Sequence, residues 1–148
     1  PMDGARGFGP RRACRYCSED LFTYIAEAPD RMVRFAQVEH VDAVRNLDEM
    51  LKVPYLDGII VGPCDLSGTI GHLNDIFHPE VLELIDICIA KCKAAGIAVG
   101  VAVGANTQED VRFWLNRGFQ FISAGSDMSA ISNGAKAQCE MMRGVANA

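Results

Sequence analysis

The stretch LDGIIVGPCDLSG, residues 56–68, decides the fold class of this protein. Its apolar part, 56–62, predicts a buried strand that stops at Gly62-Pro63. A carboxylate, Asp65, follows at once, in what we expect to be a short loop with glycines on both sides. An acid directly after a buried strand is typical of α/β proteins, whose functional groups gather where parallel strands end.

The same order of apolar run and amphipathic segment occurs four times. The expected strands are 32–39, 56–62, 96–104 and 119–127, and the expected helices are 41–51, 78–96, 107–118 and 128–146. Pro79 and Gly96 are typical of the first position and the C-cap of the second helix. Thr107 with Asp110 resembles a capping box, whereas Gly134 weakens the last helix. Strands with little apolar–polar alternation indicate a parallel sheet with helices outside.

Composition excludes several classes of protein. The 148 residues are 49% hydrophobic and 22% charged, which is typical of one soluble globular domain. A net charge of −5 argues against nucleic-acid binding, because such surfaces are usually basic. No apolar stretch reaches the roughly 18–20 residues of a membrane span. The first residues lack the apolar segment of a secretion signal, so we expect a cytoplasmic protein.

Six cysteines are present, and without a secretion signal we expect reduced thiols. Cys14-x-x-Cys17 is the one spacing that suggests zinc, and Cys88 and Cys92, four residues apart on one helix, offer a second pair. We prefer the interpretation that the cysteines are small buried side chains.

Two carboxylates should meet at one edge of the predicted sheet. Glu39 ends the first strand and Asp65 follows the second, while Gly104-Ala105-Asn106 and Gly125-Ser126-Asp127 follow the third and fourth. Neighbouring strands lie about 4.8 Å apart. Carboxylate oxygens at adjacent strand ends can therefore share one hard cation, Mg²⁺ or Mn²⁺. Gln37 lies two residues before Glu39, so it faces the same side and can donate a hydrogen bond there.

Other interpretations of these residues stay open. Asp65 can cap a turn, and Glu39 can be a solvated strand end. His40 is adjacent to Glu39 and so faces the other way; we interpret it as supporting the site or starting a helix. His72 and His78 are interpreted as structural. Asp127 is the expected N-cap of the last helix, with a binding role second.

Six blocks of the sequence resemble, in the same order, the C-terminal half of the HpcH/HpaI aldolase family. They are GARGFGPRRA (4–13), AQVEH (36–40), NLDEML (46–51), DGIIVGPCDLSGTIG (57–71), HPEV (78–81) and ISAGSDMSAI (122–131). The resemblance implies α/β architecture: the C-terminal half, four βα units, of a TIM (β/α)₈ barrel. Residues 1–148 would form that partial barrel. Because a full barrel needs about 200–250 residues, we expect a portion of a longer protein that lacks the N-terminal half here.

The resemblance also implies chemistry. The family cleaves 2-keto-4-hydroxy acids to pyruvate and an aldehyde through a metal-bound enolate, using Mg²⁺ or Mn²⁺, with Co²⁺ as an alternative. Its metal ligands match Glu39 and Asp65, and its pyruvate-contacting glutamine matches Gln37. The backbone N–H of Cys64, where many relatives have alanine, would bind the pyruvate carboxylate. The family's acid/base histidine and substrate-binding arginine match no residue here, so no catalytic residue is identified in this chain.

Rival functions remain. Another lyase of the superfamily would decarboxylate oxaloacetate or cleave an acyl-CoA hydroxy acid, and a non-catalytic barrel fragment or assembly module would do neither. A Schiff-base aldolase is disfavoured because Lys52, Lys91, Lys93 and Lys136 lie on expected helices or just after one. We expect a homo-oligomer, since the last segment carries several apolar residues and a half-barrel leaves sheet edges open.

Overall fold

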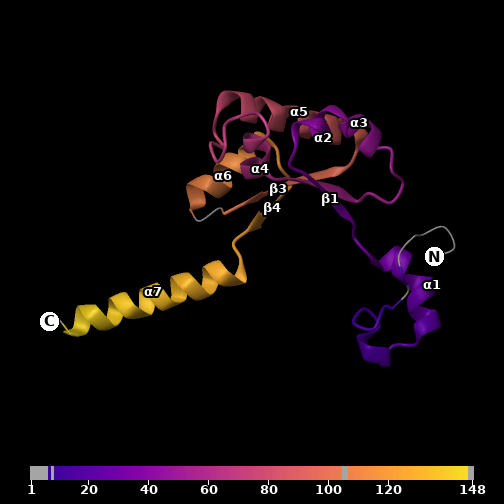
Figure 1. Cartoon of the computed structure of the whole chain (residues 1–148), viewed down its shortest axis with the longest axis horizontal. Coiled ribbons are helices and arrows are strands. Elements are labelled where there is room, and N and C mark those ends of the chain that lie inside the picture. The colour runs from indigo at the N-terminus through magenta and orange to yellow at the C-terminus, as the bar shows by residue number, and fades with distance from the viewer. Residues whose placement is uncertain (1–6, 8, 105–106, 147–148) are drawn as a thin grey trace. The chain divides into compact units, whose positions relative to one another are not determined.

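The computed structural model describes residue 7 and residues 9–104 and 107–146 (Figure 1). The chain divides into two compact units, Pro1–Val33 and Arg34–Ala148. No helix in the described part of the chain is both long and apolar enough to cross a membrane.

The second unit is built on a parallel four-stranded sheet. Its strands are paired in chain order: β1 (Phe35–Val38), β2 (Gly58–Val61), β3 (Ala98–Val103) and β4 (Phe121–Ala124). The helices between and after them are α2 (Val41–Arg45), α3 (Leu47–Met50), α4 (Pro63–Gly68), α5 (Pro79–Ala95), α6 (Gln108–Arg117) and α7 (Asp127–Ala146). The prediction of four successive βα units in one parallel sheet is confirmed.

Helices α2 to α6 cover one face of the sheet and form the hydrophobic core with it (Figure 1). Val38, Val61 and Val101 of three neighbouring strands are completely buried under these helices. The long helix α5 contributes the apolar stripe that its sequence predicts, Val81, Ile85, Cys88, Ile89 and Cys92. Burial of each large apolar side chain contributes about 1.5–3 kcal/mol, so this layer supplies most of the stabilisation.

On the other face of the sheet, two aromatic rings from the edge strands meet across the middle strands. The rings of Phe35 in β1 and Phe121 in β4 lie 5.1 Å apart. Gly58 and Gly100 pair with them in the sheet register, and a Cβ atom at either glycine would overlap a ring. Glycine is therefore required at both positions for the rings to close over β2 and β3. Phe35 stays 46% exposed, so this face is only partly buried.

The helix ends follow from their sequences. Pro79 begins α5, and Gly96 ends it in the left-handed conformation with φ of 70°. Thr107 and Asp110 form the predicted capping box at the start of α6, each side chain accepting the other's backbone N–H.

Three features of the helices differ from expectation. The predicted helix 41–51 is two short helices, because Asn46 adopts a non-helical conformation between them. The last helix is continuous through Gly134. Ser126, and not Asp127, caps it: the Ser126 hydroxyl accepts from the backbone N–H of Ser129 at 3.1 Å, while Asp127 is the first helical residue.

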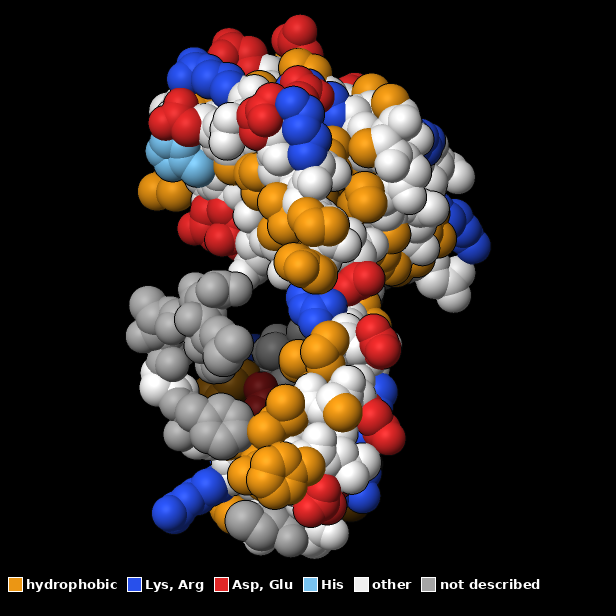
Figure 2. All heavy atoms as spheres, turned by 90° about the vertical axis from the view of Figure 1, so that its right-hand side faces the viewer, with side chains coloured by type: hydrophobic (Ala, Val, Ile, Leu, Met, Phe, Trp, Pro, Cys, Tyr) orange, Lys and Arg blue, Asp and Glu red, His pale blue; other side chains and the backbone are white. Residues whose placement is uncertain are grey.

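The first unit contains a helix that we did not predict, α1 (Leu21–Arg31), after a short 3-10 turn η1 (Arg15–Cys17). Asp20 caps α1 through the backbone N–H of Thr23 at 2.9 Å. Proline usually breaks a helix. Pro29 lies in the last turn of α1, where its missing N–H removes few of the backbone hydrogen bonds of the helix. Phe22 of α1 is 79% exposed, and Figure 2 shows such hydrophobic side chains, in orange, on the molecular surface.

Candidate active site

Gln37 and Glu39 lie together at the carboxyl end of β1. Strand parity predicts that both side chains face the same side, and the Gln37 amide Nε2 donates to Glu39 Oε1 at 2.7 Å. Glu39 is partly buried, whereas Gln37 is exposed. The hydrogen bond orients the carboxylate and occupies one of the two N–H donors of the amide, so the other remains for a second acceptor.

Gly62 lies beside this carboxylate. The sheet register pairs Val38 with Val61, which places Glu39 and Gly62 next to each other where the two strands end. The backbone N–H of Gly62 donates to the carbonyl of Val38 at 3.0 Å. A Cβ atom on Gly62 would lie 2.7 Å from Glu39 Oε1 and 2.6 Å from its Cγ, closer than side chains approach one another. Glu39 therefore holds this position because residue 62 has no side chain.

Asp65 follows three residues after Gly62, in the first turn of α4. We expected a loop here, and this expectation is wrong because Pro63 stands at the first helical position, where its fixed φ favours a helix start. The Asp65 carboxylate is exposed and makes no hydrogen bond or ion pair with the described residues. The turn-capping interpretation of Asp65 is therefore not what the structure shows.

Cys64 lines a hollow at the same ends of β2, β3 and β4. Its thiol is exposed. Its backbone N–H lies in the first turn of α4, where the helix provides no carbonyl acceptor four residues earlier. The hollow has a volume of about 310 Å³. It is lined by Cys64, Ala102, Val103, Gly104, Ser123, Gly125, Ser126 and Ser129. Ala105 and Asn106 of the expected third loop lie outside the described residues.

Ser67 is a residue of this segment whose role the sequence did not reveal. It is completely buried, and its hydroxyl donates to the carbonyl of Cys64 at 2.6 Å and accepts from the backbone N–H of Asn74 at 2.9 Å. Ser67 thus fastens the connection after α4 to the helix that carries Asp65. A serine in a polar segment gives no sign of such partners, because Asn74 is seven residues away.

His40, Cys88 and Cys92 have structural roles. His40 caps α2, since its Nδ1 accepts from the backbone N–H of Asp42 at 3.1 Å. Burial raises the pKa of Cys88 to about 12, with the neighbouring Cys92 adding to the effect, and raises the pKa of Cys92 to about 11. Both side chains belong to the buried hydrophobic core, so the interpretation of these two cysteines as small buried side chains is confirmed. Cys14 is buried in the other unit.

Known proteins with similar sequences include aldolases. The family model for HpcH/HpaI aldolase/citrate lyase matches residues 6–134. A 2-dehydro-3,6-dideoxy-6-sulfogluconate aldolase of Pseudomonas putida is 34% identical over 145 residues, covering 97% of this chain and 55% of that protein. A 2-keto-3-deoxy-L-rhamnonate aldolase of Salmonella dublin is 34% identical over 148 residues, covering 98% of this chain and 54% of that protein.

Solved structures show the same correspondence. An HpcH/HpaI aldolase/citrate lyase family protein from Burkholderia cenocepacia superposes with a TM-score of 0.78 at 29% identity, covering 95% of this chain and 54% of that one. The chain thus spans about half the length of the relatives it matches. The four βα units correspond to half of such a barrel-like protein, as the resemblance to the family implies.

Proposed function

The chain belongs to the HpcH/HpaI aldolase/citrate lyase family, and on this premise we propose that it is the part of a metal-dependent aldolase that holds the metal ligands. The proposed reaction cleaves a 2-keto-4-hydroxy acid to pyruvate and an aldehyde. The observation that carries the proposal is the hydrogen-bonded pair of Gln37 and Glu39 beside Gly62. Asp65 follows Gly62 by three residues, and its side chain has no partner among the residues that the structure describes. Both relatives named above are aldolases whose substrates carry a keto group at carbon 2, in agreement with this proposal.

The donor set fits a hard divalent cation. Glu39 and Asp65 offer only oxygen atoms, and Asp65 has no cationic side chain beside it among the described residues. Mg²⁺ and Mn²⁺ prefer such ligands and keep positions open for water or substrate, with Co²⁺ as an alternative. When bound, the cation supplies a Lewis acid that stabilises negative charge on a keto oxygen.

The chain's own residues would bind and orient the keto acid. Gln37 has one N–H left after its bond to Glu39 and can donate it to a substrate oxygen. The first-turn N–H of Cys64 can donate to a carboxylate at the start of α4. The serines that line the adjacent hollow offer hydroxyl groups to a polar aldehyde. The proton-transfer group is proposed to come from outside the residues of this chain.

The test is a comparison of substrates. With Mn²⁺ present and the missing half of a family barrel supplied, we expect pyruvate release from a 2-keto-3-deoxy sugar acid. Preferred decarboxylation of oxaloacetate, or cleavage of an acyl-CoA hydroxy acid, would instead identify another lyase of this superfamily. Absence of all three activities in the completed protein would favour a non-catalytic assembly module.

Gly62→Ala should disturb the site by moving Glu39. The new methyl group would overlap the Glu39 carboxylate, so we expect Mn²⁺ affinity to fall about 10–100-fold, as when an outer-shell partner of a metal ligand is lost. Calorimetric titration with Mn²⁺ measures this. Gly68→Ala in α4 is the matched control, because its Cβ would meet only the exposed Leu73 side chain. An unchanged affinity in Gly62→Ala would refute the positioning role.

We also propose that α7 associates with another copy of this chain. All of its side chains that the structure describes are exposed, and its large apolar residues are Met128, Ile131, Met141, Met142 and Val145. A single helix with so much exposed apolar surface gains its stability from packing. In sedimentation experiments we expect an oligomer that Ile131→Glu with Met142→Glu dissociates, whereas Lys136→Glu leaves it intact. A parent protein that sediments as a monomer at high concentration would contradict this.

A further inference from the structure

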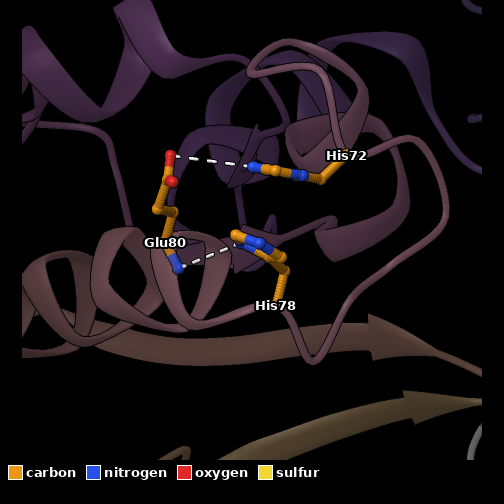
Figure 3. Close-up of side chains that lie close together, drawn as sticks. All are labelled: His72, His78 and Glu80. Atoms are coloured by element: carbon orange, nitrogen blue, oxygen red, sulfur yellow. Dashed lines mark hydrogen bonds and ion pairs between the residues drawn. The ribbon is translucent and has the colours of Figure 1, made fainter.

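Two histidines and a glutamate cluster where the connection after α4 meets the start of α5 (Figure 3). The imidazole rings of His72 and His78 are stacked, with centroids 3.5 Å apart and an interplanar angle of 18°. The Glu80 carboxylate points toward the His72 ring, with 3.7 Å between His72 Nε2 and Glu80 Oε2. His72 belongs to the connection, His78 is the N-cap of α5 and Glu80 lies in its first turn.

The distances in this cluster suit a bridging metal ion better than direct contacts. A hydrogen bond from an imidazole N–H to a carboxylate spans about 2.7–3.2 Å, so 3.7 Å is too long. Two ligand atoms at about 2.0–2.2 Å from one tetrahedral zinc ion lie roughly 3.4 Å apart. One ligand atom from each of the three side chains lies within 4.8 Å of the other two. Because the planes of the two stacked rings are nearly parallel, the rings would have to turn to aim one nitrogen each at the ion, which the exposure of these side chains permits.

The hydrogen bonding of His78 favours metal binding. His78 Nδ1 accepts from the backbone N–H of Glu80 at 3.3 Å and therefore carries no proton. Neutral imidazole is the form that binds metals, and the Glu80 carboxylate supplies compensating negative charge.

We propose that His72, His78 and Glu80 form a second metal site, which binds a borderline d-block dication, Zn²⁺. Two imidazole nitrogens and one carboxylate oxygen are an established zinc donor set that leaves the fourth position to water. This donor set differs from the oxygen-only set of Glu39 and Asp65, so the two sites should select different metals. Binding through His78 would replace the long cap hydrogen bond to Glu80, which lies at an exposed helix end where water can take its place.

A bound Zn²⁺ would restrict the conformation of the connection between α4 and α5. His72 lies within the connection and Glu80 lies in the first turn of α5, and the connection begins at the helix that carries Asp65. The ion would therefore stabilise the segment that Ser67 already holds through Asn74. The proposal is independent of the aldolase function, because no residue is shared between the two sites.

The test uses the full chain with Glu39→Gln and Asp65→Asn, so that the first site is disabled. Calorimetry should show one equivalent of Zn²⁺. His72→Gln should weaken binding at least about 10–100-fold, since a direct ligand matters no less than an outer-shell partner. His78→Asn should do the same while keeping a side chain that can cap α5. His40→Asn is the matched control, because His40 caps α2 in the same way outside the cluster.

Cobalt spectroscopy identifies the ligands. Co²⁺ should give the visible absorption of a four-coordinate site without a thiolate charge-transfer band, and this signal should disappear in His72→Gln and at acid pH, where protons compete for imidazole. The proposal is overturned if the histidine variants bind Zn²⁺ as the parent does, if no equivalent of Zn²⁺ binds, or if the cobalt spectrum shows cysteine ligation. Circular dichroism on each variant verifies that it is folded.

Discussion

Asp65→Asn should weaken Mn²⁺ binding by about 100-fold or more while leaving the fold intact. Asparagine has nearly the same shape, but its neutral carbonyl oxygen attracts a hard dication far less than a carboxylate does. Loss of an outer-shell partner already costs about 10–100-fold in metal affinity, and Asp65 is proposed as a direct ligand. The Asp65 side chain has no partner among the described residues, so its replacement breaks no contact. Only its favourable position at the start of α4 is lost, which is worth less than about 1 kcal/mol.

Calorimetric titration with Mn²⁺ and a thermal melt separate these two effects. Asp30→Asn is the control, because Asp30 is also an exposed aspartate, and it belongs to α1 and not to the proposed metal site. Glu39→Gln should lower Mn²⁺ affinity to a similar extent. Equal Mn²⁺ affinities in the parent and in Asp65→Asn would remove Asp65 from the metal site, but would leave the proposed Zn²⁺ site untouched.

Pyruvate release by the 148-residue chain alone should be at least about 100-fold slower than by the same chain joined to the first half of a family barrel. Proton transfer by a positioned side chain contributes about 10²–10⁴-fold in rate, and no residue of this chain matches the family's acid/base histidine. The match to relatives covers about half their length. The first half of the barrel would also cover the sheet face on which the partly exposed ring of Phe35 lies.

A lactate dehydrogenase assay follows pyruvate directly, with a 2-keto-3-deoxy sugar acid as substrate and Mn²⁺ in excess. The joined protein carrying Asp65→Asn should return to the rate of the short chain, which shows that the gain depends on this half. Equal rates for the short and joined proteins would mean that the catalytic groups lie within the 148 residues and have been misassigned.

The local elements follow from the sequence because their causes are local. Apolar runs of strand length, a proline at the start of α5 and glycines at the ends of α5 and α6 predict the elements within a few residues. The same reasoning missed α1, because Pro29 in its last turn resembles a breaker. It also missed α4, since a helix of six residues shows no apolar period. The resemblance to the family supplied the barrel, which these periodicities alone do not specify.

The candidate site, too, was predicted from the sequence only in part. Strand parity by itself places Gln37 and Glu39 on one side, and their hydrogen bond confirms it. Only the tertiary structure shows that Gly62 makes room for Glu39, because that contact depends on the register between two strands 20 or more residues apart in sequence. The stacking of His72 on His78 likewise depends on the path of the connection between two helices. The sequence thus determined which residue types reach the strand ends, whereas packing between distant segments decided which of them touch.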